Sequence, residues 1–405
     1  MSSITLEGVG KRFGNFTAVQ RMDLAVENGE FVAILGPSGC GKSTTMNMVA
    51  GLESVSDGRI RFGDRDVTDE PVERRGVGFV FQNYAIFTHM SVRRNLEFGL
   101  LVQGRPASER RRAVERMAEF MELTARLDQN AATLSVNELQ KLAIGRSAIV
   151  EPAIFLLDEP LSNLDAAFRE RMRSDLRQIQ QRLGQTMLYV THDQIEAMGL
   201  ADRIAVMSNG ELQQFDTPGN IYREPANVYV ARFIGAPSMN ILPAELVEGG
   251  RRVRVGGNAS GATSLEVPTR YRGAVSDRLA RGGLRSTSLL LGFRPEAVDG
   301  PSSGAEPGSD GPGVMRWSLA PTLIETVGRR RIGHFELAGT QLRGTWHRSV
   351  PLCAGVPVDL VLGERNLYLF DADDERALPS EPMGEPSRQL VGEPGPRGGI
   401  TGVSS

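Results

Sequence analysis

The chain has 405 residues, of which 40% are hydrophobic and 23% charged, as in ordinary globular proteins of two or three domains. Its 46 basic and 49 acidic residues are mixed along the sequence and give a net charge of −3. This balance lacks the basic excess of nucleic-acid-binding proteins, so no nucleic-acid partner is expected. The two cysteines, Cys40 and Cys353, lie far apart, which argues against a disulfide framework and fits a reducing compartment.

No targeting or membrane-spanning segment is expected. The first residues, MSSITLEGVGKRFG, lack the apolar core of a signal peptide. The strongest apolar runs, FVAIL (31–35) and IFLL (154–157), are far shorter than the ~18 residues that a spanning helix needs. We therefore expect the chain itself to lie in the cytosol and to reach a membrane only through a partner.

The first strong pattern is a strand, a glycine-rich loop and a helix. Residues 4–6 and 23–35 read as strands, the second with a turn at Asn28–Gly29. The second run ends directly in GPSGCGKST, and TTMNMVAGLE then has the character of a helix. GPSGCGKS (36–43) fits the phosphate-loop pattern, and the flanking strand and helix disfavour the alternative of a glycine-rich turn with a chance lysine.

Each residue type in this loop suits phosphate binding. Gly36, Gly39 and Gly41 allow backbone N–H groups to curl around an anion. The following helix directs its positive end at the same phosphates. We expect Lys42 to contact the β- and γ-phosphates of a nucleotide and the Ser43 hydroxyl to bind Mg²⁺.

Three further strands end in polar residues. AIFLLDEP (153–160) predicts that Asp158 holds Mg²⁺ through water and that Glu159 polarises the attacking water, although adjacent acids also occur as plain surface residues. His192 ends the strand TMLYVTHD (186–193) and is placed to contact the γ-phosphate, and Gln82 ends GVGFVFQ (76–82) and is placed to reach Mg²⁺ or the water. Neither His192 nor Gln82 alone is specific evidence of a nucleotide site. The alternation of apolar strands and helices predicts a mainly parallel sheet covered on both faces.

Two sections differ from this pattern. Between the strands, SERRRAVERMAEFMEL (108–123) predicts a helix whose apolar face holds Ala113, Met117, Phe120 and Met121. After residue 236, short alternating glycine-rich segments predict a small, barrel-like all-β domain. Residues 300–313 are expected to form a flexible loop, and the Pro/Gly-rich tail from Asp373 to be disordered.

Over residues 3–240 the chain resembles the ATP-binding subunits of ABC transporters, specifically those of carbohydrate and glycerol-phosphate importers. The matching segments, in chain order, are KRFG, GPSGCGKST (Walker A), FVFQNYAIFTHMSV (Q-loop), IFLLDEP (Walker B), SNLDA (D-loop), YVTHDQIEAM (switch histidine) and FIGAPSMN. GFRPEAV (292–298) and NLYLFD (366–371) are similar, more weakly, to the regulatory β domain of these importers.

The resemblance implies an α/β fold of the P-loop NTPase type, a RecA-like core with an antiparallel β part and a helical subdomain, followed by an OB-like β domain. The implied domains are residues 1–235 (helical subdomain about 84–150), 236–372 and a disordered tail 373–405. It also implies nucleotide contacts by Phe13, which stacks on adenine in the family, by Gly36, Pro37, Ser38, Gly39, Cys40, Gly41, Lys42, Ser43 and Thr44, and by Ser135, Asn137 and Asp165.

The family assembles as two ATPase subunits that close around two ATP molecules, each held between the Walker loops of one subunit and the LSGGQ signature of the other. The dimer drives two integral-membrane permeases, which take solute from an extracytoplasmic binding protein. The resemblance therefore places the chain on the cytoplasmic face of a bacterial inner membrane. The groove from Gln82 to about Met121, with Tyr84, Phe87 and His89, is expected to receive a permease helix.

The signature position departs from the family, because it reads LSVNE. Ser135 and Glu138 have the spacing of a capping box at the start of a helix. Val136 and Asn137 replace glycines, and valine tolerates left-handed backbone poorly. Because the residues that act on the chain's own ATP are intact, a heterodimer with a second ATPase that carries LSGGQ is favoured over a homodimer.

Three functions stay open at this point. The leading one is the ATPase of a sugar, polyol or glycerol-phosphate importer. A nucleotide-binding regulatory subunit with little turnover is the alternative, because the signature is degenerate. A nucleic-acid-associated ABC protein is the third, and the single nucleotide module and absent basic surface disfavour it.

Overall fold

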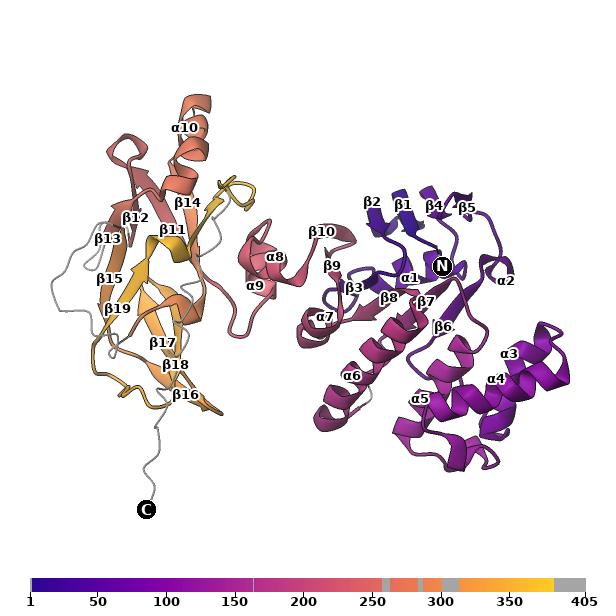
Figure 1. The fold of residues 1–405 in the computed structure, drawn as a ribbon. Coiled ribbons are helices and arrows are strands. Elements are labelled where there is room, and N and C mark those ends of the chain that lie inside the picture. The colour runs from indigo at the N-terminus through magenta and orange to yellow at the C-terminus, as the bar shows by residue number, and fades with distance from the viewer. Residues whose placement is uncertain (1, 163, 257–262, 283–286, 301–312, 382–405) are drawn as a thin grey trace, which may run out of the picture.

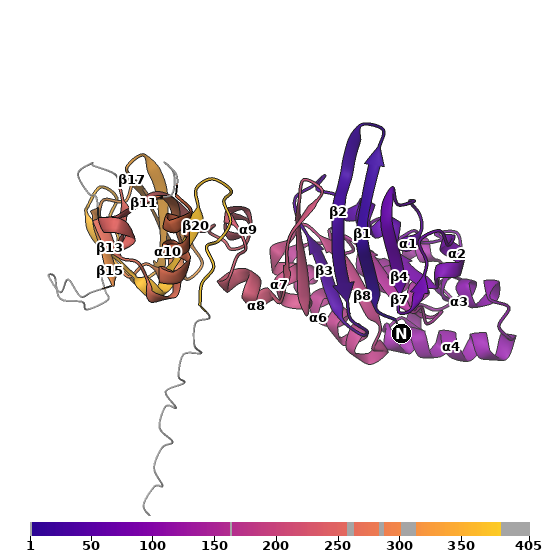
Figure 2. The same cartoon turned by 90° about the horizontal axis from the view of Figure 1, so that it is seen from above.

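A computed structural model describes residues 2–162, 164–256, 263–282, 287–300 and 313–381. Figure 1 shows two bodies side by side, an α/β part built from the first half of the chain and a β-rich part built from the second. Helices α8 (Pro218–Arg223) and α9 (Val228–Phe233) lie between them, and Figure 2 shows the same order from above. Within the described residues, no helix is both long and apolar enough to cross a membrane.

The centre of the first body is a sheet of mainly parallel strands. In spatial order its described strands are β10 (Glu211–Asp216), β9 (Arg203–Ser208), β3 (Phe31–Leu35), β8 (Thr186–Thr191), β7 (Ile154–Asp158) and β6 (Val77–Val80). Strands β9, β3, β8, β7 and β6 pair in parallel, and β10 pairs antiparallel with β9 at one edge. Every residue of β3 and β8 is buried, as the continuous apolar runs predict for a sheet covered on both faces.

Each face of this sheet has its own core. On one face, α1 (Lys42–Ala50) packs Met46 and Met48 with residues of a second, antiparallel sheet. That sheet has the described order β2 (Phe16–Val26), β1 (Ile4–Phe13), β4 (Asp57–Phe62) and β5 (Arg65–Asp66). On the other face, α6 (Ala166–Leu183), α7 (Gln194–Leu200) and the helical section pack against Phe31 and Phe155.

The helical section lies beside β6 (Figure 1). Its longer helices are α3 (Val92–Val102), α4 (Ala107–Phe120) and α5 (Val136–Ala148), and the short α2 (Val72–Arg75) precedes β6. The predicted apolar face of α4 does pack against the core, since Met121 is buried and Ala113, Met117 and Phe120 are partly buried there.

The N-terminal strands are longer than the sequence indicated. Residues 4–6 and 23–35 read as strands, but β1 runs to Phe13 and β2 begins at Phe16, so the two form a hairpin with Phe13 opposite Phe16. Several register shifts between β1 and β2 break the alternation of side chains that identifies a strand in a sequence.

The second body is a set of sheets around one core. Its described sheets are β13 (Thr263–Glu266), β12 (Arg252–Val255), β11 (Asn240–Val247), β14 (Ser288–Phe293) and β20 (Leu367–Asp371); β15 (Val314–Leu319) with β19 (Val358–Gly363); and β16 (Leu323–Val327), β17 (Arg330–Leu337) and β18 (Thr340–His347). Leu291, Trp317 and Phe335, one from each sheet, share this core. The region also contains a helix, α10 (Arg272–Arg281), that the expectation of an all-β domain left out.

The beginning of the expected disordered tail is ordered. Arg376 pairs with Asn227 next to α9, and Ala377 pairs with Phe370 of β20. The Glu375 carbonyl accepts a hydrogen bond from the Val228 N–H at 2.9 Å. The prediction of disorder from Asp373 is therefore wrong for residues 373–381, because a proline-rich composition does not reveal a distant pairing partner. Most of the expected loop 300–313 and the rest of the tail lie outside the described residues.

Candidate functional site

The residues predicted to bind nucleotide follow neighbouring strands of the central sheet. Strands β3, β8, β7 and β6 are adjacent and parallel, so their carboxyl ends meet at one edge. The phosphate loop follows β3, and His192 follows β8. Asp158 ends β7 with Glu159 directly after it, and Gln82 follows β6. The fold thus gathers groups that are separated by more than 100 residues in sequence.

The phosphate loop depends on its glycines. Gly39 and Gly41 have φ angles of +80° and +103°, in the left-handed region that side chains disfavour. A Cβ atom on Gly36 would lie 2.4 Å from the Met207 carbonyl oxygen and 2.5 Å from the Cys40 sulfur. Gly41 is also the N-cap of α1 and supplies no side-chain cap, so the loop leaves N–H groups of the first turn for an anion.

The side chains of Lys42 and Cys40 point in different directions. Lys42 is buried, and its Nζ donates to the carbonyls of Gly36 and Pro37 at 2.9 Å each, so its charge lies inside the curve of the loop. Cys40 packs into the core beneath the loop, where burial raises the pKa of its thiol. Its side chain therefore faces away from the loop mouth.

Ser43 and Asp158 form the part of the site suited to a metal ion. The Ser43 hydroxyl donates to Asp158 Oδ1 at 3.3 Å. Burial raises the pKa of Asp158, the hydrogen bond from Ser43 lowers it, and the neighbouring charge of Glu159 raises it. A divalent cation here would relieve the burial of a charged carboxylate, and Mg²⁺ favours hard oxygen ligands completed by phosphate oxygens. The residues present thus fit the ion.

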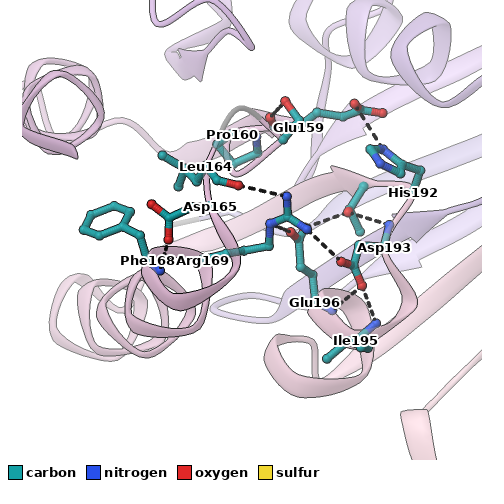
Figure 3. Close-up of polar contacts among 12 residues, drawn as sticks. Glu159, Pro160, Leu164, Asp165, Phe168, Arg169, His192, Asp193, Ile195 and Glu196 are labelled. Carbon is teal, nitrogen blue, oxygen red and sulfur yellow. Dashed lines mark hydrogen bonds and ion pairs between the residues drawn. The ribbon is translucent and has the colours of Figure 1, made fainter. Parts of the chain in front are cut away.

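Glu159 and His192 meet above the end of the sheet (Figure 3). The Glu159 carboxylate lies 3.3 Å from His192 Nδ1. Glu159 has a φ of 44°, an unusual backbone for a residue other than glycine, and hydrogen bonds hold it there. Its N–H donates to the Val190 carbonyl at 3.0 Å, and its carbonyl accepts from the Ser162 hydroxyl at 2.9 Å. The strained backbone directs the carboxylate at the histidine.

Gln82 and Asp165 lie beside this pair but have other partners. The Gln82 side-chain amide donates to the Ser162 hydroxyl at 3.3 Å, which joins the end of β6 to the loop after β7. The Asp165 carboxylate accepts from the Phe168 N–H at 2.9 Å and so caps α6. In this structure the Asp165 carboxylate therefore stabilises the start of α6, and its nucleotide contact stays a prediction.

Comparison with known proteins agrees with this geometry. The sequence profile described as "ABC transporter" matches residues 19–162. The sn-glycerol-3-phosphate import ATP-binding protein UgpC of Ruegeria sp. (strain TM1040) is 42% identical over 373 residues, covering 92% of this chain and 97% of that protein. The trehalose/maltose import ATP-binding protein MalK of Thermococcus litoralis is 38% identical over 385 residues, covering 93% of this chain and 100% of that one.

The chain belongs to the ATP-binding proteins of ABC transporters. The resemblance inferred from the motifs is confirmed, and with it the binding of ATP. An ATP-binding cassette of an ABC transporter, solved in its ADP conformation, shares the fold with a TM-score of 0.50 at 24% identity. The alignment covers 56% of this chain and 96% of that cassette.

Phe13, where proteins of this family stack adenine, lies at the tip of the β1–β2 hairpin with 46% of its surface exposed. Lys11 Nζ lies 4.9 Å from the centre of the ring and pairs with Glu53 at 2.6 Å. Sequence reasoning missed Lys11, because its partner is 42 residues away and no local pattern connects them. Nearly half of Phe13 therefore remains exposed beside the buried Lys11.

The altered signature is a capped helix with ordinary backbone. Ser135 is the N-cap of α5, its hydroxyl oxygen accepts from the Glu138 N–H, and the Glu138 carboxylate accepts from the Ser135 N–H at 2.9 Å. The predicted capping box is present. The Ser135 hydroxyl proton also points at Glu138, at 2.8 Å, and Arg126 pairs with the same carboxylate at 2.8 Å. These hydrogen bonds from Ser135, aided by Arg126, lower the pKa of Glu138.

The expectation that Val136 strains the backbone of the signature is wrong. Val136 is the first residue of α5 and Asn137 the second, and neither has a positive φ. Glycine is therefore not required by the local backbone, and any effect of Val136 comes from its side chain, which is 47% exposed. Ser135 and Asn137 belong to the helical section, and the structure joins Ser135 to Glu138 of its own helix.

Arg169 of α6 is another residue, besides Lys11, that sequence reasoning missed. Its guanidinium contacts the loop after Glu159 and the loop after β8 (Figure 3). Gln140 of α5 makes a comparable connection, because its side-chain amide donates to the Pro160 carbonyl at 2.9 Å. No spacing rule pairs these residues, since their partners come from other elements.

Proposed function

We propose that the chain is the ATP-hydrolysing subunit of an importer and couples hydrolysis to the uptake of a sugar, polyol or glycerol-phosphate type of solute. The observation that supports it best is the gathering of the phosphate loop, Asp158 and the Glu159–His192 pair at one sheet edge. The solute class rests on the relatives, which are named for import of sn-glycerol-3-phosphate and of trehalose and maltose.

The residues divide the reaction between them. Lys42 and the N–H groups of the phosphate loop bind the β- and γ-phosphates, and Gly36 to Thr44 form the nucleotide cradle. Mg²⁺, held by Ser43, Asp158 and Gln82, would neutralise charge on the phosphates. Glu159 accepts a proton from the attacking water, and His192, 3.3 Å away, orients that carboxylate and the γ-phosphate.

Replacement of Glu159 by Gln tests this proposal. The amide keeps the size of the side chain but cannot accept the proton, so ATP binding is retained and turnover falls by ~100-fold or more. Binding is measured with a fluorescent ATP analogue and turnover by phosphate release, both on the assembled complex. Glu245→Gln is the control, because Glu245 pairs with Arg254 in the β-rich body, away from the nucleotide site. Near-normal turnover of Glu159→Gln would remove the assignment.

The membrane partner is proposed to be a pair of permeases that contact the helical section. Phe87 and Phe98 pack edge to face there, with ring centres 4.8 Å apart, and His89 lies next to them. Leu101 and Val102 at the end of α3 are 53% and 73% exposed. A photo-crosslinker at position 89 is expected to capture a membrane subunit, which would place the chain on the cytoplasmic face of the membrane. Capture of soluble proteins alone would contradict this contact.

The dimer is proposed to be a heterodimer with a second ATPase, served from outside by a solute-binding protein. Ser135 donates both its N–H and its hydroxyl proton to Glu138, so neither donor of Ser135 is free for the ATP of a partner subunit. The same observation favours a second candidate function, a regulatory subunit with low turnover. The turnover of the wild-type complex separates the two functions.

The chain is proposed to divide into a nucleotide-binding domain, residues 1–235, and an OB-like regulatory domain, residues 236–372. The helical subdomain about 84–150 belongs to the first. Limited proteolysis near residue 236 that yields two stable fragments would support this division.

A further inference from the structure

The proposed catalytic side chains, Glu159 and His192, come from separate loops, so other contacts must hold the two loops together. Glu159 begins the loop after β7, and His192 lies in the loop after β8. Their side chains approach to 3.3 Å. A single polar contact at the protein surface, with the His192 side chain more than half exposed, contributes too little to fix that distance by itself. The connection has to come from the packing behind it.

Arg169 lies behind both loops and contacts each of them (Figure 3). Its Nη2 donates to the Leu164 carbonyl at 3.1 Å, at the end of the loop that begins with Glu159. Its Nη1 donates to Asp193 Oδ2 at 3.3 Å, and Asp193 is the residue after His192. One planar guanidinium thus bridges the two loops with its two terminal nitrogens.

The third contact of Arg169 is with a buried carboxylate. Arg169 Nε lies 3.6 Å from Glu196, whose side chain is only 4% exposed. The other oxygen of Glu196 accepts from the hydroxyls of Tyr189 and Thr191 at 2.7 Å each. A buried carboxylate is costly unless cations and hydrogen bonds compensate it, so Arg169 is tied to this position by charge.

The buried group is itself connected to the histidine loop. The Thr191 hydroxyl oxygen accepts from the Asp193 N–H at 3.0 Å. Asp193 caps α7 by accepting from the Ile195 N–H at 2.7 Å. His192 therefore lies between two residues, Thr191 and Asp193, that are both fixed through the Arg169–Glu196 pair.

We propose that Arg169 is a positioning residue for ATP hydrolysis, which sets the distance between Glu159 and His192 by clamping their two loops. The inference rests on the proposed ATPase function and adds a residue to it. Arg169 does not touch either catalytic side chain in this network; it acts through the Leu164 carbonyl and through Asp193. Displacement of a catalytic group by about 1 Å can lower a rate ~100-fold.

Three variants separate positioning from mere charge compensation. Arg169→Met removes the clamp and leaves Glu196 without its cation, so both stability and turnover should fall. Arg169→Met combined with Glu196→Gln removes the buried charge as well, so the thermal midpoint should recover while turnover does not. Arg169→Lys keeps a cation near Glu196 but cannot bridge both loops, so it should rescue stability more than turnover.

The control is Arg177→Met on the same helix. Arg177 pairs with Asp202 at 2.6 Å, two turns further along α6. This variant loses an arginine–aspartate pair from the same element without touching either catalytic loop. It should lower the thermal midpoint and leave kcat unchanged.

The assay is steady-state ATP hydrolysis by the assembled complex, with thermal unfolding of each variant. We expect kcat of the double variant to fall ~10-fold or more, with KM for ATP within ~3-fold of the wild type, because the phosphate loop is untouched. Recovery of both stability and kcat in the double variant would show that Arg169 only compensates Glu196, and would overturn the proposal. Normal kcat in Arg169→Met would overturn it as well.

A readout without turnover distinguishes this inference from the proposed function. Hydrogen exchange at the amides of Leu161, Ser162 and Leu164 and of residues 191–193 should be faster in the double variant than in Arg177→Met, whether or not the wild type hydrolyses ATP. If the wild type is inactive and exchange still increases, the ATPase proposal fails and the clamp stands. Unchanged exchange in both loops would reject the clamp.

Discussion

Replacing Val136 and Asn137 by glycine tests whether the N-terminus of α5 takes part in ATP hydrolysis. Both residues lie in the first turn of the helix, and the capping box of Ser135 and Glu138 does not depend on their side chains. Helix propensities put the cost of the two glycines at about 0.5–1 kcal/mol in unfolding free energy. Because Val136 is half exposed, little buried surface is lost, and the thermal midpoint should fall by at most ~4 °C.

The effect on turnover depends on what α5 faces. In a homodimer both ATP molecules would face LSVNE, and removal of the valine side chain should raise the ATPase rate by ~10-fold or more, which corresponds to about 1.4 kcal/mol in the barrier. In a heterodimer, α5 faces a site that mainly binds ATP. The rate should then change less than ~2-fold, or about 0.4 kcal/mol. We expect the second result.

The assay is phosphate release by the purified complex, whose subunits are counted by native mass spectrometry. Val136→Ala is the matched control, because alanine removes most of the bulk while it favours the helix. A large gain in rate from a complex with two copies of this chain would refute the heterodimer. A small change, with a distinct second ATPase in the complex, would agree with it.

Further predictions concern the site and its supports. Asp158→Asn should raise the thermal midpoint of the nucleotide-free protein, because burial raises the pKa of Asp158 and disfavours its charged form at neutral pH. The same variant should lower Mg²⁺-dependent turnover ~100-fold. A lower thermal midpoint would contradict this prediction. Gly36→Ala should lower the free energy of unfolding in denaturant by about 1–3 kcal/mol and weaken ATP binding, because the Cβ of the alanine would collide with the Met207 carbonyl. An unchanged free energy of unfolding would refute the collision. A maleimide at pH 7 should modify the exposed Cys353 well before Cys40, whose thiol is buried with a raised pKa; equal rates by peptide mass spectrometry would argue otherwise.

The nucleotide site was predictable from sequence because its chemistry is local. A buried strand such as FVAIL must end at the sheet edge, and the glycine loop and helix that follow it are continuous in the chain. The same holds for Asp158, which ends a strand that is apolar on both faces, and for Glu159, which directly follows it. Parallel strands then bring these ends together without any further information from the side chains.

The unpredicted features depend on residues far apart in the chain. Arg169 reaches Asp193 across 24 residues, and neither belongs to a pattern that names the other. The capping box was predictable because Ser135 and Glu138 are three residues apart, but the backbone of Val136 was not, since it depends on where the helix begins. Register shifts between β1 and β2 made most of β1 hard to recognise for a related reason, because they change which face each side chain occupies.

The paired segment near the C-terminus determines how the two bodies can move. The chain crosses from the first body to the second near Gly235, whose N–H donates to the Gln194 side chain at 2.7 Å, and it returns at residues 375–377, which pair beside α9. A third connection comes from Arg294 after β14, which is buried and donates to the carbonyls of Ala231 and Tyr222 at 3.1 and 2.8 Å. Val228 and Ala231 of α9 also pack with Ile241 and Phe370 of the β-rich body. In any rearrangement of the two bodies, α9 should therefore move together with the β-rich body.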